Sequence, residues 1–87
     1  WLRERGVAVL GCDGVSDVIP SGIEGGAGLP IHFGAIVAMG VHLIDNAQLE
    51  DLGAACERAG RWEFLLTLAP LRLLKGTASP VNPIAML

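Results

Sequence analysis

The segment from Pro30 to Asn46 contains both histidines of the chain, His32 and His42, together with Asp45. Imidazole nitrogens and carboxylate oxygens are the usual ligands of zinc and related divalent metals in proteins. The same side chains also make ordinary hydrogen bonds, and a dedicated metal site needs three or four convergent ligands. The segment is therefore compatible with two alternatives, a metal site or a structural role for these residues.

A helix followed by a strand is expected to position these side chains. Pro30 suits the first helical position and Gly40 the residue just past a helix end, which predicts a helix over about 31–39. From residue 41 the apolar pattern alternates, as on a strand. Asp45 and His42 then point to opposite sides of that strand, so we expect His32, in the first helical turn, to join Asp45.

The helix start also affects the charge expected on His32. The partial positive charge at a helix N-terminus disfavours imidazolium. We therefore expect a neutral His32 that can offer a lone pair to a metal.

The composition indicates an incomplete structural unit. Of the 87 residues 52% are hydrophobic and only 17% are charged, which is more apolar than usual for an isolated soluble domain. The opening segment Trp1–Gly6 has the pattern of the last turns of a helix closed by a glycine. We expect the chain to be a small α/β piece whose apolar faces are covered by the rest of a larger domain or by a partner subunit.

Charge and hydropathy argue against two classes of partner. The net charge is −3 and the six basic residues are scattered along the chain, so nucleic acid is not expected to bind. No apolar run is long enough to span a bilayer, and the N-terminus has no basic-then-apolar leader. We expect a cytoplasmic protein that does not interact with membranes.

The two cysteines, Cys12 and Cys56, form no CxxC pattern and are expected to be reduced. Cys56 falls on the apolar face of a predicted helix, where a thiol behaves as a small hydrophobe. A nucleophilic Cys12 remains an alternative, but the sequence places no base near it.

The N-terminal half of the chain contains a predicted strand, an acidic loop and a glycine-rich loop. The continuous apolar run at 7–11 predicts a strand covered on both faces. Asp13 and Asp17 follow it, in a position where α/β folds commonly bind ligands but where aspartates more often stabilise turns. The glycine-rich loop at about 21–29 lacks the spacing of a phosphate-binding loop and is expected to be a flexible connection or lid.

The C-terminal half is expected to contain one helix and two strands. Asn46 is a suitable N-cap for an amphipathic helix that carries Glu50 and Asp51 in its first turn and ends at Gly60. Apolar runs at 62–70 and at 81–87 then predict strands, each restricted by proline, and residues 71–74 are a candidate extension of the first.

Several of these segments together resemble the C-terminal part of the cyclase family of metal-dependent hydrolases, which includes bacterial kynurenine formamidases and isatin hydrolases. The resemblance covers nearly the whole chain, and its most distinctive part is Leu68–Arg72 leading to Ser79–Val81. The matching segments are Val9–Asp13 with Asp17 and Pro20, Leu29–His32, Gly40–Asn46 with Leu49 and Glu50, Leu68–Arg72, and Ser79–Val81.

This resemblance implies a fold and an activity. The fold would be a swivelling β/β/α domain with a mixed sheet and packed helices, of which residues 1–87 form the C-terminal fragment. The activity would be hydrolysis of an amide-type C–N bond in a small cyclic or formylated substrate, by water activated on zinc or manganese. The family's metal region maps onto His32 and Asp45, and a homo-oligomer is expected.

Two departures from the family pattern matter. The family's His-x-Gly-Thr-His-x-Asp-x-Pro-x-His run supplies most metal ligands and a catalytic histidine, and it is absent from this sequence. These 87 residues alone should therefore be inactive, with the catalytic residues in a missing N-terminal part. In addition, the acid before Asn46 is more often glutamate in the family, so Asp45 carries a shorter side chain.

Two rival interpretations remain. The chain could be a non-catalytic module or degenerate family member that binds a partner through its apolar faces. It could also be a small thiol enzyme that uses Cys12. The sequence identifies neither the substrate nor the metal, since one histidine and one carboxylate suit zinc, manganese or iron.

Overall fold

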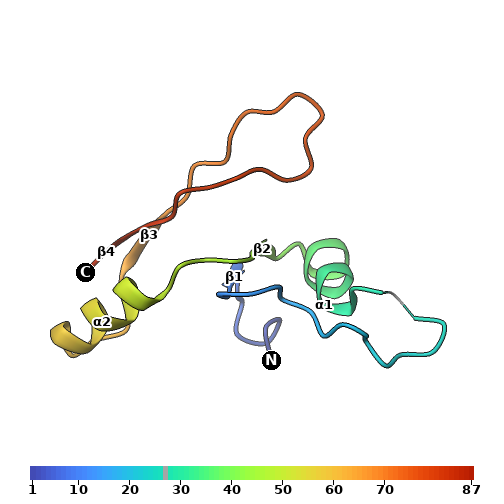
Figure 1. Ribbon diagram of the computed structural model, residues 1–87, viewed down its shortest axis with the longest axis horizontal. Helices are drawn as coiled ribbons and strands as arrows, with labels where there is room; N and C mark the ends of the chain where they lie inside the picture. Colours follow the sequence, from blue (N-terminus) through green and yellow to red (C-terminus); the bar gives the residue numbers. More distant parts are fainter. Residues whose placement is uncertain (27) are drawn as a thin grey trace. The chain divides into compact units, whose positions relative to one another are not determined.

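The computed structural model describes residues 1–26 and 28–87 and has a mixed α/β architecture, as the sequence predicts. The chain divides into two compact units, Trp1–Leu49 and Glu50–Leu87. The elements in chain order (Figure 1) are β1 (Val9–Gly11), α1 (Pro30–His32), the π-helix η1 (Phe33–Met39), β2 (His42–Ile44), α2 (Glu50–Ala59), β3 (Leu65–Thr67) and β4 (Ile84–Met86).

The first unit opens with a turn that has the geometry of a helix C-terminus. The N–H of Gly6 donates to the carbonyl of Arg3, and the N–H of Val7 donates to that of Leu2. Gly6 has a φ of 62°, in the left-handed region that glycine adopts without steric cost. This pair of bonds is a Schellman arrangement, which fits the glycine-closed end that the sequence predicts, although the structure shows turns here rather than the predicted helix.

Strands β1 and β2 pair in parallel, with Val9 opposite His42 and Gly11 opposite Ile44. The pairing continues past the strand ends, because the N–H of Ala47 donates to the carbonyl of Cys12 at 2.9 Å. Val9 and Leu10 are half-buried, so the prediction that this strand is covered on both faces is not met within the described structure. The parallel pairing brings the residues that follow each strand to the same edge.

The predicted helix at 31–39 is present, with Pro30 at its start and Gly40 past its end. After its first turn the helix widens from α to π geometry over Phe33–Met39. Gly40 ends it with a φ of 69°, and its N–H donates to the carbonyl of Ala35. Ala35 and Val41 are buried apolar residues here, and the N–H of Val41 donates to the carbonyl of Ala35 at 2.8 Å, where η1 contacts β2.

The second unit consists of α2 and a two-stranded antiparallel sheet. Glu50 and Asp51 lie in the first turn of α2, as expected, and Gly60 closes the helix with a φ of 64°. The prediction of Asn46 as N-cap is wrong, because α2 begins only at Glu50. Asn46 instead adopts a φ of 55°, which asparagine tolerates better than most residues, and its N–H donates to the carbonyl of Gly14.

Strands β3 and β4 are shorter than the apolar runs that predict them, with Leu65 paired to Met86 and Thr67 to Ile84. Residues 71–74 do not extend β3, and a turn follows at Leu74 and Lys75. Leu65, Ile84 and Met86 are exposed. Within the described residues, no helix has both the length and the apolar character to cross a bilayer.

Candidate functional site

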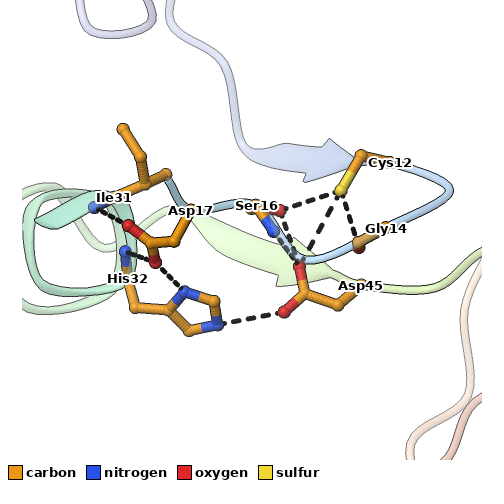
Figure 2. A network of polar contacts seen from close by, with 7 residues as sticks. All are labelled: Cys12, Gly14, Ser16, Asp17, Ile31, His32 and Asp45. Carbon is orange, nitrogen blue, oxygen red and sulfur yellow. Dashed lines mark hydrogen bonds and ion pairs between the residues drawn. The ribbon is translucent and has the colours of Figure 1, made fainter. Parts of the chain in front are cut away.

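His32 and Asp45 face each other across the first unit, as Figure 2 shows. His32 Nε2 and Asp45 Oδ2 are 3.0 Å apart. The Pro30–Gly40 helix supplies the histidine at its first turn, and the end of β2 supplies the acid. His42 is an exposed residue of β2, paired opposite Val9. The sequence-based expectation that His32 rather than His42 joins Asp45 is therefore met in the geometry, whereas the metal role of this pair stays a prediction.

Asp17 occupies the other side of the His32 ring. One oxygen of its carboxylate, Oδ2, contacts His32 Nδ1 and also accepts the N–H of His32 at 3.1 Å. The second oxygen, Oδ1, accepts the N–H of Ile31 at 2.6 Å. The Asp17 side chain is 0% exposed and that of His32 is 27% exposed, so the acid lies behind the ring. Asp17 therefore fixes the start of the helix and the histidine ring together.

Ser16 holds the Asp45 carboxylate in a comparable way. Asp45 Oδ1 accepts the Ser16 hydroxyl at 2.6 Å and the Ser16 backbone N–H at 3.0 Å. Cys12 lies beside them, with its Sγ 3.2 Å from Ser16 Oγ and 2.9 Å from the carbonyl oxygen of Gly14. Cys12 Sγ also lies 4.0 Å from Asp45 Oδ1. With these donors on Oδ1, Asp45 Oδ2 is the oxygen that faces His32 (Figure 2).

The electrostatics of the site favour two carboxylates around a cationic imidazole. The hydrogen bond to Asp17 raises the pKa of His32, and the charge of Asp45 adds to this effect against the opposing effect of burial. Burial opposes ionisation of Asp17, but the N–H groups of Ile31 and His32 and the His32 ring outweigh it and lower the pKa of Asp17. The Ser16 hydroxyl is the main cause of the lowered pKa of Asp45.

This result corrects one sequence-based expectation. The helix start was expected to keep His32 neutral, yet the pKa of His32 is raised. The helix dipole acts on the ring through partial charges, whereas Asp17 and Asp45 contact it directly with full negative charges. Two contacting carboxylates outweigh the dipole.

Sequence reasoning missed the roles of Asp17 and Ser16. The sequence predicts a turn-stabilising or ligand-binding role for the acids of this loop, and Asp17 belongs to the residues that carry the resemblance, but the sequence does not pair Asp17 with His32 and does not single out Ser16. The signal that could have found them is the parallel pairing of β1 and β2, which brings residues after both strands to one edge. Asp13, the other acid of that loop, is exposed.

The donor set fits a divalent metal in part. Two ligands of one tetrahedral zinc ion lie about 3.3 Å apart, close to the observed separation of Nε2 and Oδ2. A carboxylate on the far nitrogen of a ligating histidine is also the usual supporting contact in metal sites. His32 and Asp45 supply two donors, and no group of three or more His, Cys, Asp or Glu suited to a metal occurs among residues 1–26 and 28–87.

An open apolar depression borders His32. Its lining comes from the segment before the helix and from one side of the helix: Gly28, Leu29, His32, Phe33, Ile36 and Val37. Phe33 and Val37 are exposed in this structure. The depression gives the imidazole an apolar border on the side of η1.

Comparisons with protein-family models, with curated proteins and with solved structures gave no match to this chain.

Proposed function

We propose that this chain is the C-terminal part of a cyclase-like, metal-dependent hydrolase, in which His32 and Asp45 are two of the ligands of a zinc or manganese ion. The substrate would be a small molecule with an amide-type C–N bond, either cyclic or formylated. The fold would be the C-terminal part of a swivelling β/β/α domain in a cytoplasmic homo-oligomer. The proposal combines the sequence resemblance with the geometry of the His32–Asp45 pair.

The observation that carries the proposal is the 3.0 Å approach of His32 Nε2 to Asp45 Oδ2, with the other polar atom of each side chain already engaged. An ordinary structural ion pair needs only one contact. Here Asp17 contacts His32 Nδ1, and Ser16 donates to Asp45 Oδ1. The remaining polar atoms, His32 Nε2 and Asp45 Oδ2, face each other. A bound cation would replace the proton that His32 Nε2 shares with Asp45 when the ring is charged, since metal binding and protonation compete for the same lone pairs.

In this proposal His32 and Asp45 hold the metal, and Asp17 keeps His32 Nδ1 protonated as a donor. A bound divalent ion lowers the pKa of a coordinated water and polarises a carbonyl, which is the chemistry that amide hydrolysis requires. In the resembling family the remaining ligands come from the His-x-Gly-Thr-His-x-Asp-x-Pro-x-His run. A segment with that run would have to complete the site before hydrolysis could occur.

A second candidate is a non-catalytic module that binds a partner protein. The observation that favours it is the exposed apolar sheet of the second unit, where Leu65, Ile84 and Met86 are accessible. Large exposed apolar patches often mark interaction surfaces. Metal binding distinguishes the two candidates, because only the hydrolase requires it.

The test is the metal content of the full-length protein, in which the remaining ligands are present, measured by elemental analysis after dialysis against zinc or manganese. We expect bound metal in the wild type and at least a tenfold loss of affinity in His32→Ala and in Asp45→Ala, since each removes one donor. His42→Ala is the matched control, because it removes an exposed histidine from the same segment. Circular dichroism would establish that each variant is folded.

Either of two outcomes would contradict the hydrolase proposal. One is a wild-type protein that binds no metal, and the other is full retention of metal by both site variants. The partner-binding module would then be the better account.

A further inference from the structure

Two adjacent loop residues, Ser16 and Asp17, contact the two members of the candidate metal pair. Asp17 contacts Nδ1 of His32, and Ser16 donates a hydrogen bond to Oδ1 of Asp45. We infer that Ser16 and Asp17 are positioning residues that fix which atoms of His32 and Asp45 face a metal ion. The inference rests on the proposed function, since it takes His32 and Asp45 as ligands.

The Asp17 contact determines the tautomer of His32. An ionised carboxylate only accepts hydrogen bonds, and each ring nitrogen of His32 faces one. The contact of Nδ1 with the fully covered Asp17 is the shorter of the two, whereas Asp45 is 23% exposed, so a neutral His32 keeps its proton on Nδ1. Its lone pair is then on Nε2, the atom that faces Asp45. A metal-ligating histidine is commonly oriented by a carboxylate in this way.

The Asp17 carboxylate is itself held in place. Its two oxygens accept the N–H groups of Ile31 and His32, and its side chain is fully covered. Hydrogen bonds thus link the backbone of His32 to the same carboxylate that orients its ring. Asp17 cannot rotate away from Nδ1 without breaking the hydrogen bonds at the start of the helix.

The Ser16 contacts determine the orientation of the second ligand. Asp45 Oδ1 accepts both a hydroxyl and a backbone N–H from Ser16. Rotation of the carboxylate that exchanged its oxygens would have to break both bonds. Oδ2 therefore stays the oxygen presented to His32, and Figure 2 shows Asp17 beside His32 and Ser16 beside Asp45.

Ser16 and Asp17 are neighbours in the sequence, so a single loop segment supports both His32 and Asp45. The loop that carries them follows β1, while His32 and Asp45 come from the helix and from the end of β2. One short segment thereby couples two ligands from different elements. A substitution at either loop residue should therefore weaken metal binding without removing a ligand.

The first readout is the tautomer of His32 in metal-free, ¹⁵N-labelled protein, at alkaline pH where the ring is neutral. Two-bond nitrogen–proton NMR correlations report which ring nitrogen carries the proton. We expect the Nδ1–H form in the wild type and in Asp13→Asn, the matched control for loss of an acid in the same loop. Asp17→Asn should shift His32 toward the Nε2–H form, because the amide can donate to Nδ1.

The second readout is zinc affinity by competition with a chelator. Asp17→Asn and Ser16→Ala should each lose about 10- to 100-fold in affinity, the range typical of supporting contacts behind a ligand. Ser16→Thr retains a hydroxyl and should recover most of the loss. Asp13→Asn should bind zinc as the wild type does.

Several outcomes would overturn the inference. One is an Nε2–H tautomer of His32 in the wild type, which requires no variant to fold. Another is unchanged zinc affinity in both Asp17→Asn and Ser16→Ala. A wild-type protein that binds no zinc would instead overturn the proposed function, and the tautomer, measured without metal, would still decide whether Asp17 orients His32.

Discussion

The two units of the chain differ in what their tertiary contacts achieve. In Trp1–Leu49, residues far apart in sequence meet: β1 pairs with β2, and Asp17 and Asp45 converge on His32. In Glu50–Leu87, one helix and a short antiparallel sheet form, and large apolar side chains on both strands stay exposed. The first unit contains a connected polar network, whereas the second presents apolar surface.

This difference predicts how sensitive the stability of each unit is to substitution. Hydrogen bonds between specific side-chain and backbone atoms hold the polar network of the first unit together, so single substitutions should disrupt the network strongly. The exposed strands of the second unit gain little from their apolar side chains in this structure, because those side chains remain in water. Substitutions in the two units should therefore have unequal effects on stability.

The largest expected effect comes from placing a charge at a buried site of the first unit. Val41 is 4% exposed, so Val41→Asp should lower the free energy of unfolding by about 3 kcal/mol or more, because the carboxylate would be buried without a partner. Leu65→Asp is the matched change on β3, where the side chain is 63% exposed, and it should cost less than about 1 kcal/mol. Urea denaturation followed by circular dichroism measures both.

If Val41→Asp and Leu65→Asp lowered the free energy of unfolding equally, the two units would not differ in their sensitivity to a buried charge. That result would mean that Leu65 is covered in solution, as it would be in a homo-oligomer, and sedimentation of the wild type would test this directly.

A smaller effect is expected at the two glycines that end the helices. Gly40 and Gly60 have φ values of 69° and 64°, and an added Cβ would meet no atom within 4 Å at either position. Gly40→Ala and Gly60→Ala should each cost about 1–2 kcal/mol, the penalty of the left-handed conformation for an L-residue. Because space is not limiting, the two losses should be alike in both units, and a markedly larger loss at Gly40 would show that the π-helix depends on this glycine.

A gain in stability is expected from the glycine inside α2. Gly53 lies in the middle of that helix, and a Cβ added there would meet nothing within 4 Å. Gly53→Ala should raise the free energy of unfolding by about 0.5–1 kcal/mol, since alanine has less backbone entropy to lose. Thermal unfolding measures the change, and a loss of stability would mean that another surface packs closely against this position.

The smallest expected effect is the pH dependence of the His32 network in the metal-free protein. The folded pKa of His32 is raised, so its contribution is fully present below its unfolded pKa of about 6.5 and is lost as the pH rises through the folded value. The folded pKa values of Asp17 and Asp45 are lowered, so their contributions are present above about pH 3.9 and are lost as the pH falls through the folded values.

The network should therefore stabilise the fold most between about pH 4 and pH 6.5. Urea titrations across pH should show the largest difference between the wild type and His32→Gln in this window, and a smaller difference at higher pH. The difference between the wild type and Gly53→Ala, which alters no charge, is the control and should stay flat. A His32→Gln difference that grew with rising pH would contradict the assigned ion pairs.

Local features of this protein could be predicted from the sequence because short-range chemistry determines them. Pro30 and Gly40 marked the two ends of one helix, Gly60 marked the end of another, and alternation after residue 40 predicted a strand. These assignments depend on backbone conformations that only a few residue types favour. Asn46 was misassigned because asparagine suits both an N-cap and a left-handed turn, and the sequence alone does not separate these roles.

The composition of the polar site was only partly predictable. The sequence alone selected His32 and Asp45, because strand alternation separates Asp45 from His42 by face. Asp17 and Ser16 joined them only through the parallel pairing of β1 and β2, which brings residues about thirty positions apart to one edge. The direction of the His32 pKa shift likewise depends on tertiary structure, since two carboxylates distant in sequence contact the ring and raise its pKa against the effect of the local helix dipole.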